Sequence, residues 1–392
     1  MYRYSQRLPW AFSSNPLTRS IQEKRRAQCP LLDLTVSNPT QAFDDYPHTD
    51  IRAIYSDVNS YIYEPDPAGL ESARIAVSNW YAKRGISLSP ANLLLTASTS
   101  EAYALLLKLF CDPGDEILVP LPSYPLFEFL AALEAVRIVP YRLRYDGAWF
   151  VDFDTLRANI GPRTGAIVVV NPNNPTGSFL KRSESHQLFS LADEYNLPVI
   201  SDEVFMQYPL ANSPDCVRTF IGNDSGLNFS LNGLSKIAGM PQMKLGWIAI
   251  NGPAADRQIA RDRLELLLDT YLSVNTPVQR ALPGLLDLGA QVEERIRDRA
   301  VRNLASGQEI LRNTAAHFLH AEGGWSAIVQ LPSVLSEEAW ALRLLDEYNI
   351  IVQPGYFFDM GSEAYVVVSL IAPPDQFDEG LRRLAHLVSS EC

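Results

Sequence analysis

Short apolar runs alternate with helix-like segments from about Asn92 onward. The apolar runs are NLLLTAS, DEILVPL, AIVVVNP, LPVIS, LNFSLNG and KLGWIAI. Between them lie EAYALLLKLF, YPLFEFLAALEA and the stretch from Glu184 to Tyr195, which have helical patterns. Continuous apolar runs are typical of strands buried on both faces, and their alternation with helices favours parallel pairing. The pattern therefore predicts an α/β fold with a mostly parallel sheet flanked by helices.

The chain after about Asn275 has a different pattern. A long polar helix is expected through QVEERIRDRAVRNLASGQEILRN, and a second helix near Glu337 to Glu347. The run GGWSAIVQLP lies between them, and IIVQ and AYVVVSL resemble strands. This mixture predicts a smaller α+β domain, and the segment from Leu31 to Pro39 is expected to cross between the two units. We therefore expect a large domain over residues 46–280 and a small domain made from both chain ends, residues 1–45 and 281–392.

Length and composition fit a two-domain globular protein. The chain has 392 residues, of which 47% are hydrophobic and 20% charged, and one domain usually holds about 100 to 200 residues. No stretch approaches the roughly 20 apolar residues that a membrane helix needs, so no membrane partner is expected. The N-terminal MYRYSQRLPWAFSSNP lacks the apolar core of a secretory signal, which predicts a cytoplasmic location.

Charge and metal-ligating residues argue against several other classes of protein. The net charge of -12 would repel a phosphate backbone, so no nucleic-acid partner is expected. The four cysteines have no paired spacing, which predicts neither a disulfide framework nor a cysteine-based zinc site. The five histidines are scattered, and no metal site is predicted from them.

Three polar motifs directly follow predicted strands. They are NPNNPTG (171–177) after AIVVV, SDEVF (201–205) within and after PVIS, and GLSK, which ends at Lys236 after NFSLN. Each motif alone has an ordinary explanation as a turn, a helix cap or a solvated lysine. Together, they place Asn174, Asp202 and Lys236 at the ends of successive strands, where active sites of such sheets lie. We therefore expect the three side chains to converge on a crevice that holds a cofactor.

In these motifs and their order, the sequence resembles the fold-type I pyridoxal-phosphate enzymes, specifically the class I/II aminotransferases, over nearly the whole chain. The resemblance implies that pyridoxal 5'-phosphate is the cofactor and that Lys236 forms the Schiff base with its aldehyde. Asp202 then corresponds to the carboxylate beneath the pyridine nitrogen, where its negative charge favours the protonated ring. Asn174 corresponds to the asparagine that hydrogen-bonds the 3'-oxygen, and Tyr124 in LPSYP to the aromatic residue that stacks on the ring.

The same resemblance implies a set of residues around the cofactor's phosphate. TASTSEAY begins a helical pattern and offers hydroxyl and backbone N–H groups at a helix N-terminus. Lys244 stands where most relatives have an arginine, and it keeps the charge without the bidentate fork. Tyr63 in YEPDPAGL resembles a tyrosine that reaches the phosphate of the neighbouring subunit, which implies a homodimer. The expected phosphate and lysine-loop residues are Ser98, Thr99, Ser100, Ser235, Lys244 and Tyr63.

The sequence also departs from the family pattern at three positions. Phe205 replaces a common tyrosine near the 3'-oxygen, and Gly233 replaces a frequent phosphate-binding serine. Val367 in AYVVVSL stands where the family carries the arginine that binds the substrate carboxylate. Either that carboxylate is held otherwise, or the amino donor has no α-carboxylate. The residues that could hold or line the substrate are Asn174, Asn38 of SNPT, Arg19 and Tyr356 of PGYFFD.

The resemblance predicts an aminotransferase that works in two half-reactions. It would move an amino group from an amino acid or amine to a keto acid or aldehyde, with Lys236 as the base that carries the proton. A lyase, decarboxylase or racemase would use the same residues, since these enzymes differ in which α-carbon bond is broken. A ligand-sensing domain without catalytic activity is a further alternative, which the acidic net charge disfavours if DNA is its partner.

Overall fold

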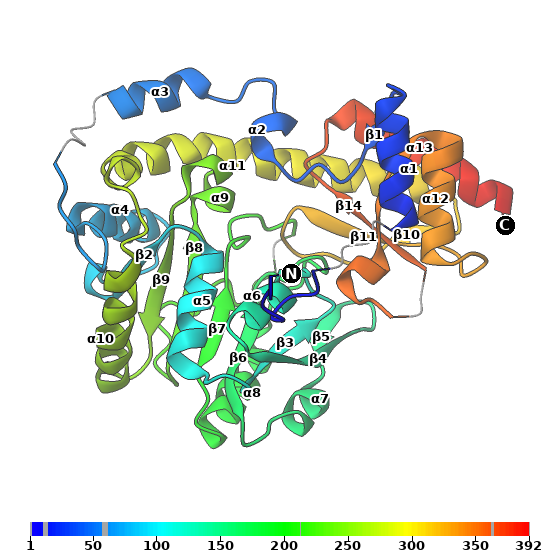
Figure 1. Ribbon diagram of the computed structural model, residues 1–392. Coiled ribbons are helices and arrows are strands. Elements are labelled where there is room, and N and C mark those ends of the chain that lie inside the picture. Colours follow the sequence, from blue (N-terminus) through cyan, green and yellow to red (C-terminus); the bar gives the residue numbers. More distant parts are fainter. Residues whose placement is uncertain (1, 11–14, 57–61, 212, 362–363, 392) are drawn as a thin grey trace.

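The computed structural model of the chain describes residues 2–10, 15–56, 62–211, 213–361 and 364–391 (Figure 1). Its largest feature is an eight-stranded sheet, called the large sheet below, with strand order β2-β9-β8-β7-β6-β3-β4-β5. Strands β4, β3, β6, β7 and β8 pair in parallel, whereas β2, β9 and β5 pair antiparallel to their neighbours. This topology confirms the predicted fold class. The strands are β2 (Leu93–Thr96), β3 (Glu116–Leu121), β4 (Arg137–Tyr145), β5 (Trp149–Val151), β6 (Thr164–Val170), β7 (Val199–Asp202), β8 (Asn228–Gly233) and β9 (Gly246–Asn251).

The central strands are buried on both faces, which explains their continuous apolar runs. In β6, Ile167 and Val169 pack into one hydrophobic cluster, while Ala166 and Val168 pack into another on the opposite face. Helices α5, α6 and α10 cover the face of Val168, and α7 and α8 cover the face of Ile167. The helices are α5 (Thr99–Phe110), α6 (Leu126–Leu133), α7 (Phe153–Ala158), α8 (Arg182–Glu194) and α10 (Ala254–Tyr271).

A second, four-stranded sheet, called the small sheet below, has the order β10-β11-β14-β13. Its strands are β10 (His317–Phe318), β11 (Ser326–Gln330), β13 (Gln353–Pro354) and β14 (Tyr365–Ser369). Val366 and Val368 of β14 pack against Trp340 and Leu344 of α12 (Glu337–Tyr348) and against α13 (Pro374–Glu391). The small sheet therefore has a core of its own.

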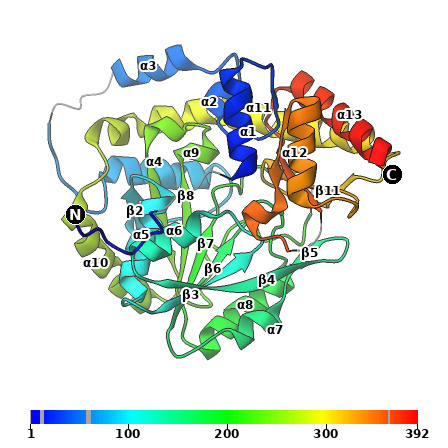
Figure 2. The same cartoon turned by 45° about the vertical axis from the view of Figure 1, so that its right-hand side comes forward.

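The N-terminal part of the chain packs onto this second core. Helix α1 (Pro16–Arg26) lies beside α12 (Figure 2), and Ser20 Oγ donates a hydrogen bond to Asp346 at 2.8 Å. Strand β1 (Leu32–Asp33) pairs in parallel with β12 (Ile350–Ile351). The two ends of the chain thus lie together.

Helix α11 (Thr276–Leu311) connects the two sheets (Figure 1). Its first part packs into the core beside α4 through residues such as Leu282, and its last part packs into the core of the small sheet through residues such as Leu304. The predicted boundary at 280/281 falls inside this continuous helix, and the division into two domains remains our proposal.

The remaining helices are α2 (Pro39–Ala42), α3 (His48–Ser56), α4 (Glu71–Ala82), α9 (Leu234–Ile237), η1 (Pro90–Asn92), η2 (Pro241–Met243) and η3 (Gly355–Phe358). Among the described helices, none is both long and apolar enough to cross a membrane.

Candidate active site

Three neighbouring strands of the large sheet carry the predicted cofactor residues at or just after their carboxyl ends. Strands β6, β7 and β8 run in parallel, and Val170, Asp202 and Leu231 pair across them. The loop with Asn174 follows β6, Asp202 ends β7, and Lys236 lies in α9 directly after β8. The structure therefore brings these three segments to the same end of the sheet.

Lys236 is a partly buried amine beside a carboxylate. Burial lowers the pKa of its amine to about 8, while Asp202 raises that pKa and Lys244 lowers it. A lowered pKa leaves more of the amine neutral near neutral pH, and only the neutral amine is a nucleophile. Lys236 therefore has the electrostatic environment that a carbonyl-binding lysine requires.

Asp202 contacts Tyr103 of helix α5. The Tyr103 hydroxyl donates a hydrogen bond to Asp202 Oδ2 at 3.1 Å, and the Val204 backbone N–H donates one to Oδ1 at 3.2 Å. Burial raises the pKa of Asp202 to about 6, against the lowering effects of these two donors and of Lys236. Tyr103 was not predicted from the sequence, and its contact with Asp202 makes it part of the site.

The N-terminus of α5 provides backbone donors near these groups. Ser98 caps the helix by accepting a hydrogen bond from the Glu101 N–H at 3.2 Å, and the Glu101 carboxylate accepts the Ala97 N–H at 2.6 Å. The N–H groups of Thr99 and Ser100 belong to the first helical turn, which has no intrahelical acceptors. Because the helix dipole makes this end positive, it suits a phosphate group.

Gly233 has a structural reason to lack a side chain. A Cβ atom added there would lie 2.8 Å from Gly246 Cα and 2.9 Å from the Leu245 carbonyl oxygen. Strands β8 and β9 could not approach so closely with a serine at this position. The departure from the family pattern therefore follows from the packing of these two strands.

The other predicted cofactor residues are more exposed. The side chain of Asn174 is partly buried and has no hydrogen-bond partner among the residues that the structure describes. Tyr124 is 49% exposed in the loop before α6, and Lys244 is exposed but close enough to affect the amine of Lys236. Ser235, in α9 beside Lys236, is partly buried.

Tyr63 lies in a different place. It is 73% exposed and lines a hollow with Leu95, Leu268 and Gln279, which includes none of the residues above. Its predicted contact with a neighbouring subunit stays a prediction.

The predicted substrate residues are spread over the N-terminal and C-terminal segments. Asn38 caps α2, and its Oδ1 accepts hydrogen bonds from the Thr40 N–H at 3.1 Å and from the Thr40 hydroxyl at 2.8 Å. Only the amide nitrogen of Asn38 is left to contact a ligand. Arg19 is exposed on α1.

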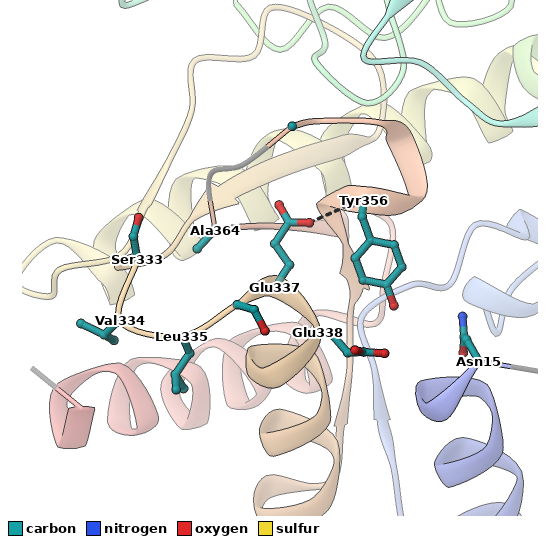
Figure 3. A pocket seen from close by; sticks show the side chains of 10 residues that line it. Asn15, Ser333, Val334, Leu335, Glu337, Glu338, Tyr356 and Ala364 are labelled. Carbon is teal, nitrogen blue, oxygen red and sulfur yellow. Dashed lines mark hydrogen bonds between the residues drawn. The ribbon is translucent and has the colours of Figure 1, made fainter.

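Tyr356 lines a surface pocket of about 690 Å³ at the N-terminus of α12 (Figure 3). Glu337, Glu338 and Asn15 also line this pocket. Asn15 is the N-cap of α1, and the other lining residues lie between positions 333 and 364. Both carboxylate oxygens of Glu337 accept backbone N–H groups, from Tyr356 at 2.6 Å and from Tyr365 at 3.0 Å. The structure therefore does not place Tyr356 in one pocket with Lys236, and its substrate role stays a prediction.

Val367 is buried in an apolar cluster. It is 1% exposed and packs with Trp149, Leu319, Ile328 and Phe358. An arginine at this position would bury its charge among apolar side chains. The structure thus places a buried apolar side chain where the family resemblance implies a charged arginine.

The family profile "Aminotransferase class I and II" matches residues 32–384. The chain belongs to this family. It is 25% identical over 374 residues to the glutamate-pyruvate aminotransferase AlaA of Haemophilus influenzae, which covers 92% of this chain and 91% of that protein. The glutamate-pyruvate aminotransferase AlaA of Escherichia coli is 30% identical over 272 residues, or 69% of this chain and 67% of that protein.

Solved aminotransferases have the same fold. The alanine aminotransferase from Pyrococcus furiosus superposes with a TM-score of 0.88 at 24% identity, covering 99% of this chain and 100% of that one. These findings confirm the predicted family and identify the chain as an aminotransferase, an enzyme class that generally depends on pyridoxal phosphate. They favour transamination over the lyase, decarboxylase, racemase and sensing alternatives.

Proposed function

We propose that this class I/II aminotransferase binds pyridoxal 5'-phosphate between Lys236 and Asp202. It would transfer an amino group from an amino acid to a keto acid in two half-reactions. The observation that carries the proposal is the pair of interacting, desolvated groups at adjacent strand ends, an amine with a pKa of about 8 and a carboxyl with a pKa of about 6. Desolvated ionisable groups with perturbed pKa values cluster at functional sites.

The residues present fit this cofactor. The amine of Lys236 would hold its aldehyde, and Asp202, supported by Tyr103, would set a negative charge against its ring nitrogen. The first turn of α5 would bind its phosphate with Ser98, Thr99 and Ser100, helped by Ser235 and Lys244. Asn174 has a free amide for the 3'-oxygen, and Tyr124 would cover the ring.

When bound, the cofactor withdraws electrons from the α-carbon of the substrate, so that the α-proton becomes acidic. The amine of Lys236 would remove this proton and hold it on its Nζ atom. Its lowered pKa suits that task, because a base works best when its pKa lies near the working pH. Asp202 is mostly ionised above about pH 6 and would supply a negative charge to the ring nitrogen.

The amino donor is proposed by class. Similarity to glutamate-pyruvate aminotransferases supports an amino acid donor and a keto acid acceptor. With Val367 in an apolar cluster, the carboxylate would be held by Asn174, by the amide of Asn38 or by Arg19. A donor without an α-carboxylate is the second candidate, which the apolar surroundings of Val367 favour.

A homodimer and a cytoplasmic location belong to the same proposal. Tyr63 is exposed, as expected of a side chain that reaches a neighbouring subunit. Light scattering on the purified protein tests the dimer, and a monomer with full activity would contradict it.

The activity is tested by saturating the purified protein with pyridoxal phosphate and adding donors one at a time. We expect the absorbance of the bound cofactor to change as donor alone converts it to its amine form, with keto acid released in equal amount. Lys236→Ala should abolish this conversion, whereas the surface variant Lys83→Ala should not, since Lys83 is 66% exposed. A protein that stays colourless with the cofactor, or that releases ammonia or carbon dioxide instead, would refute the proposal. Activity with carboxylate-free amines alone would support the second candidate.

A further inference from the structure

The amine of Lys236 lies in a corner between two aromatic rings. Its Nζ atom is 4.8 Å from the ring centroid of Trp325 and 5.5 Å from that of Phe205. The two rings meet nearly edge-on, with centroids 5.0 Å apart and planes at 74°. An ammonium group within about 6 Å of an aromatic face is attracted to it, most strongly by tryptophan. Both rings are therefore placed to attract the charged form of this lysine.

The corner is built from both sheets. Phe205 and Lys236 follow strands β7 and β8 of the large sheet, whereas Trp325 directly precedes β11 of the small sheet. Tyr208 contacts both Trp325 and the backbone of Lys236. Its ring packs on Trp325 at 5.3 Å, its hydroxyl donates a hydrogen bond to the Lys236 carbonyl oxygen, and its own carbonyl oxygen accepts the Gly324 N–H at 2.8 Å. The position of Trp325 over the amine thus depends on how the two sheets pack together.

Several charged groups surround this corner. Asp202 from β7 attracts the amine and Lys244, after η2, repels it. Glu203 is fully buried, but its carboxylate is held by Thr219, Ser230 and the Phe220 N–H. From α11, Glu293 and Arg297 act on Tyr208. Asp202 is therefore the one anion in this set that acts directly on the amine.

We propose that Trp325 is a positioning residue that, together with Phe205, holds the ammonium form of Lys236 by cation–π attraction. The ammonium form arises when Lys236 takes the proton from the substrate, so its catalytic importance rests on the proposed function. Because Trp325 directly precedes β11 of the small sheet while its ring packs in the same hydrophobic cluster as Phe205, the attraction also links the charge of this lysine to the packing of the two sheets.

The sign of the effect separates this role from a structural one. If Trp325 merely excludes water, its removal would let water in and raise the pKa of Lys236 toward its usual 10.5. If Trp325 attracts the ammonium group, replacing it by an apolar side chain that keeps the site dry would lower the pKa further.

The test measures this pKa in the cofactor-free protein. Competitive labelling with acetic anhydride over a range of pH, with mass spectrometry of the peptide that contains residue 236, reports the pKa of its amine. We expect Trp325→Leu to lower it by roughly 0.5 to 1.5 units, which speeds labelling below the pKa by roughly 3- to 30-fold. Trp325→Phe should lower it less, because it retains a ring.

Trp340→Leu is the matched control, since Trp340 is equally buried in the core of the small sheet and lies in a different hydrophobic cluster from the Lys236 loop. It should leave the labelling profile unchanged. Should Trp325→Leu fail to fold, Phe205→Leu removes the other ring and should shift the pKa in the same direction by a smaller amount. A raised or unchanged pKa in the leucine variants, or an equal shift in the control, would overturn the inference. Because no cofactor is present, this outcome is independent of whether the protein binds pyridoxal phosphate.

Discussion

Replacing Asp202 by asparagine is expected to stabilise the cofactor-free protein at pH 8 while impairing transamination. The pKa of this carboxyl rises from its usual 3.8 to about 6 on folding, mainly because it is buried. The carboxyl therefore contributes most to stability below about pH 4, where it is protonated in both states. That contribution is lost as the pH rises through 6, because the folded protein must then release a proton from a desolvated group.

The size of the effect follows from the shift. About two pKa units correspond to about 3 kcal/mol of unfolding free energy at pH 8. Asparagine removes this cost, but it offers one oxygen to the two donors, Tyr103 and Val204, and so loses about 1 kcal/mol. We expect a net gain of about 2 kcal/mol at pH 8 and almost no change at pH 4.5, where the cost of the carboxyl is about 1 kcal/mol.

The assay compares the denaturation midpoints of the cofactor-free wild type and the Asp202→Asn variant at the two pH values. Asp298→Asn is the control, since the side chain of Asp298 is 71% exposed and should give no pH-dependent difference. Two results would contradict the prediction: an equal difference between variant and wild type at both pH values, or a variant that is less stable than the wild type at pH 8. Either would show that the ionised carboxylate of Asp202 does not destabilise the folded protein.

Three further substitutions test other parts of the structure. Tyr103→Phe removes a hydrogen bond to the Asp202 carboxylate and should move the acid limb of the pH–rate profile upward by about one unit; an unmoved limb would mean that this bond is absent from the working enzyme. Val367→Arg should destabilise the protein by about 3 kcal/mol or more in urea denaturation, because it buries a charge, whereas a stable variant with tighter carboxylate binding would show that residue 367 faces the substrate. Asn303→Ala should cost about 2 to 4 kcal/mol, since the buried amide donates to the carbonyls of Leu370 at 2.8 Å and Ala372 at 2.9 Å; an unchanged denaturation midpoint would contradict this.

The sequence predicted those strands whose burial shows in their composition. Strand β6 is apolar throughout and was predicted, whereas β4 was not, because Arg137, Arg142 and Arg144 interrupt its pattern near the edge of the sheet. Helix α11 begins earlier than the sequence suggested. Its Gly284 is explained by close packing rather than by a turn, since a Cβ there would lie 3.1 Å from Ile54 of α3.

The site was predictable as far as strand ends determine it. The parallel order of β6, β7 and β8 alone brings Asn174, Asp202 and Lys236 to one end of the sheet. Tyr103 and Trp325 were missed because their contacts depend on how a helix crosses the sheet and on how two sheets pack, and neither is encoded in a local pattern. Gly323, two residues before Trp325, marks a close approach near that point, since a Cβ there would lie 2.5 Å from the ring of Phe179.

The parallel pairing of β1 with β12 has a consequence for synthesis of the protein. Leu32 and Asp33 leave the ribosome long before their partners Ile350 and Ile351 have been translated. Until then, the neighbouring Leu34, which is completely buried in the finished molecule, has no core to enter. Residues 32–34 are thus translated early but reach their final packing late. A nascent chain halted before β12 should therefore be cleaved by proteases at this segment.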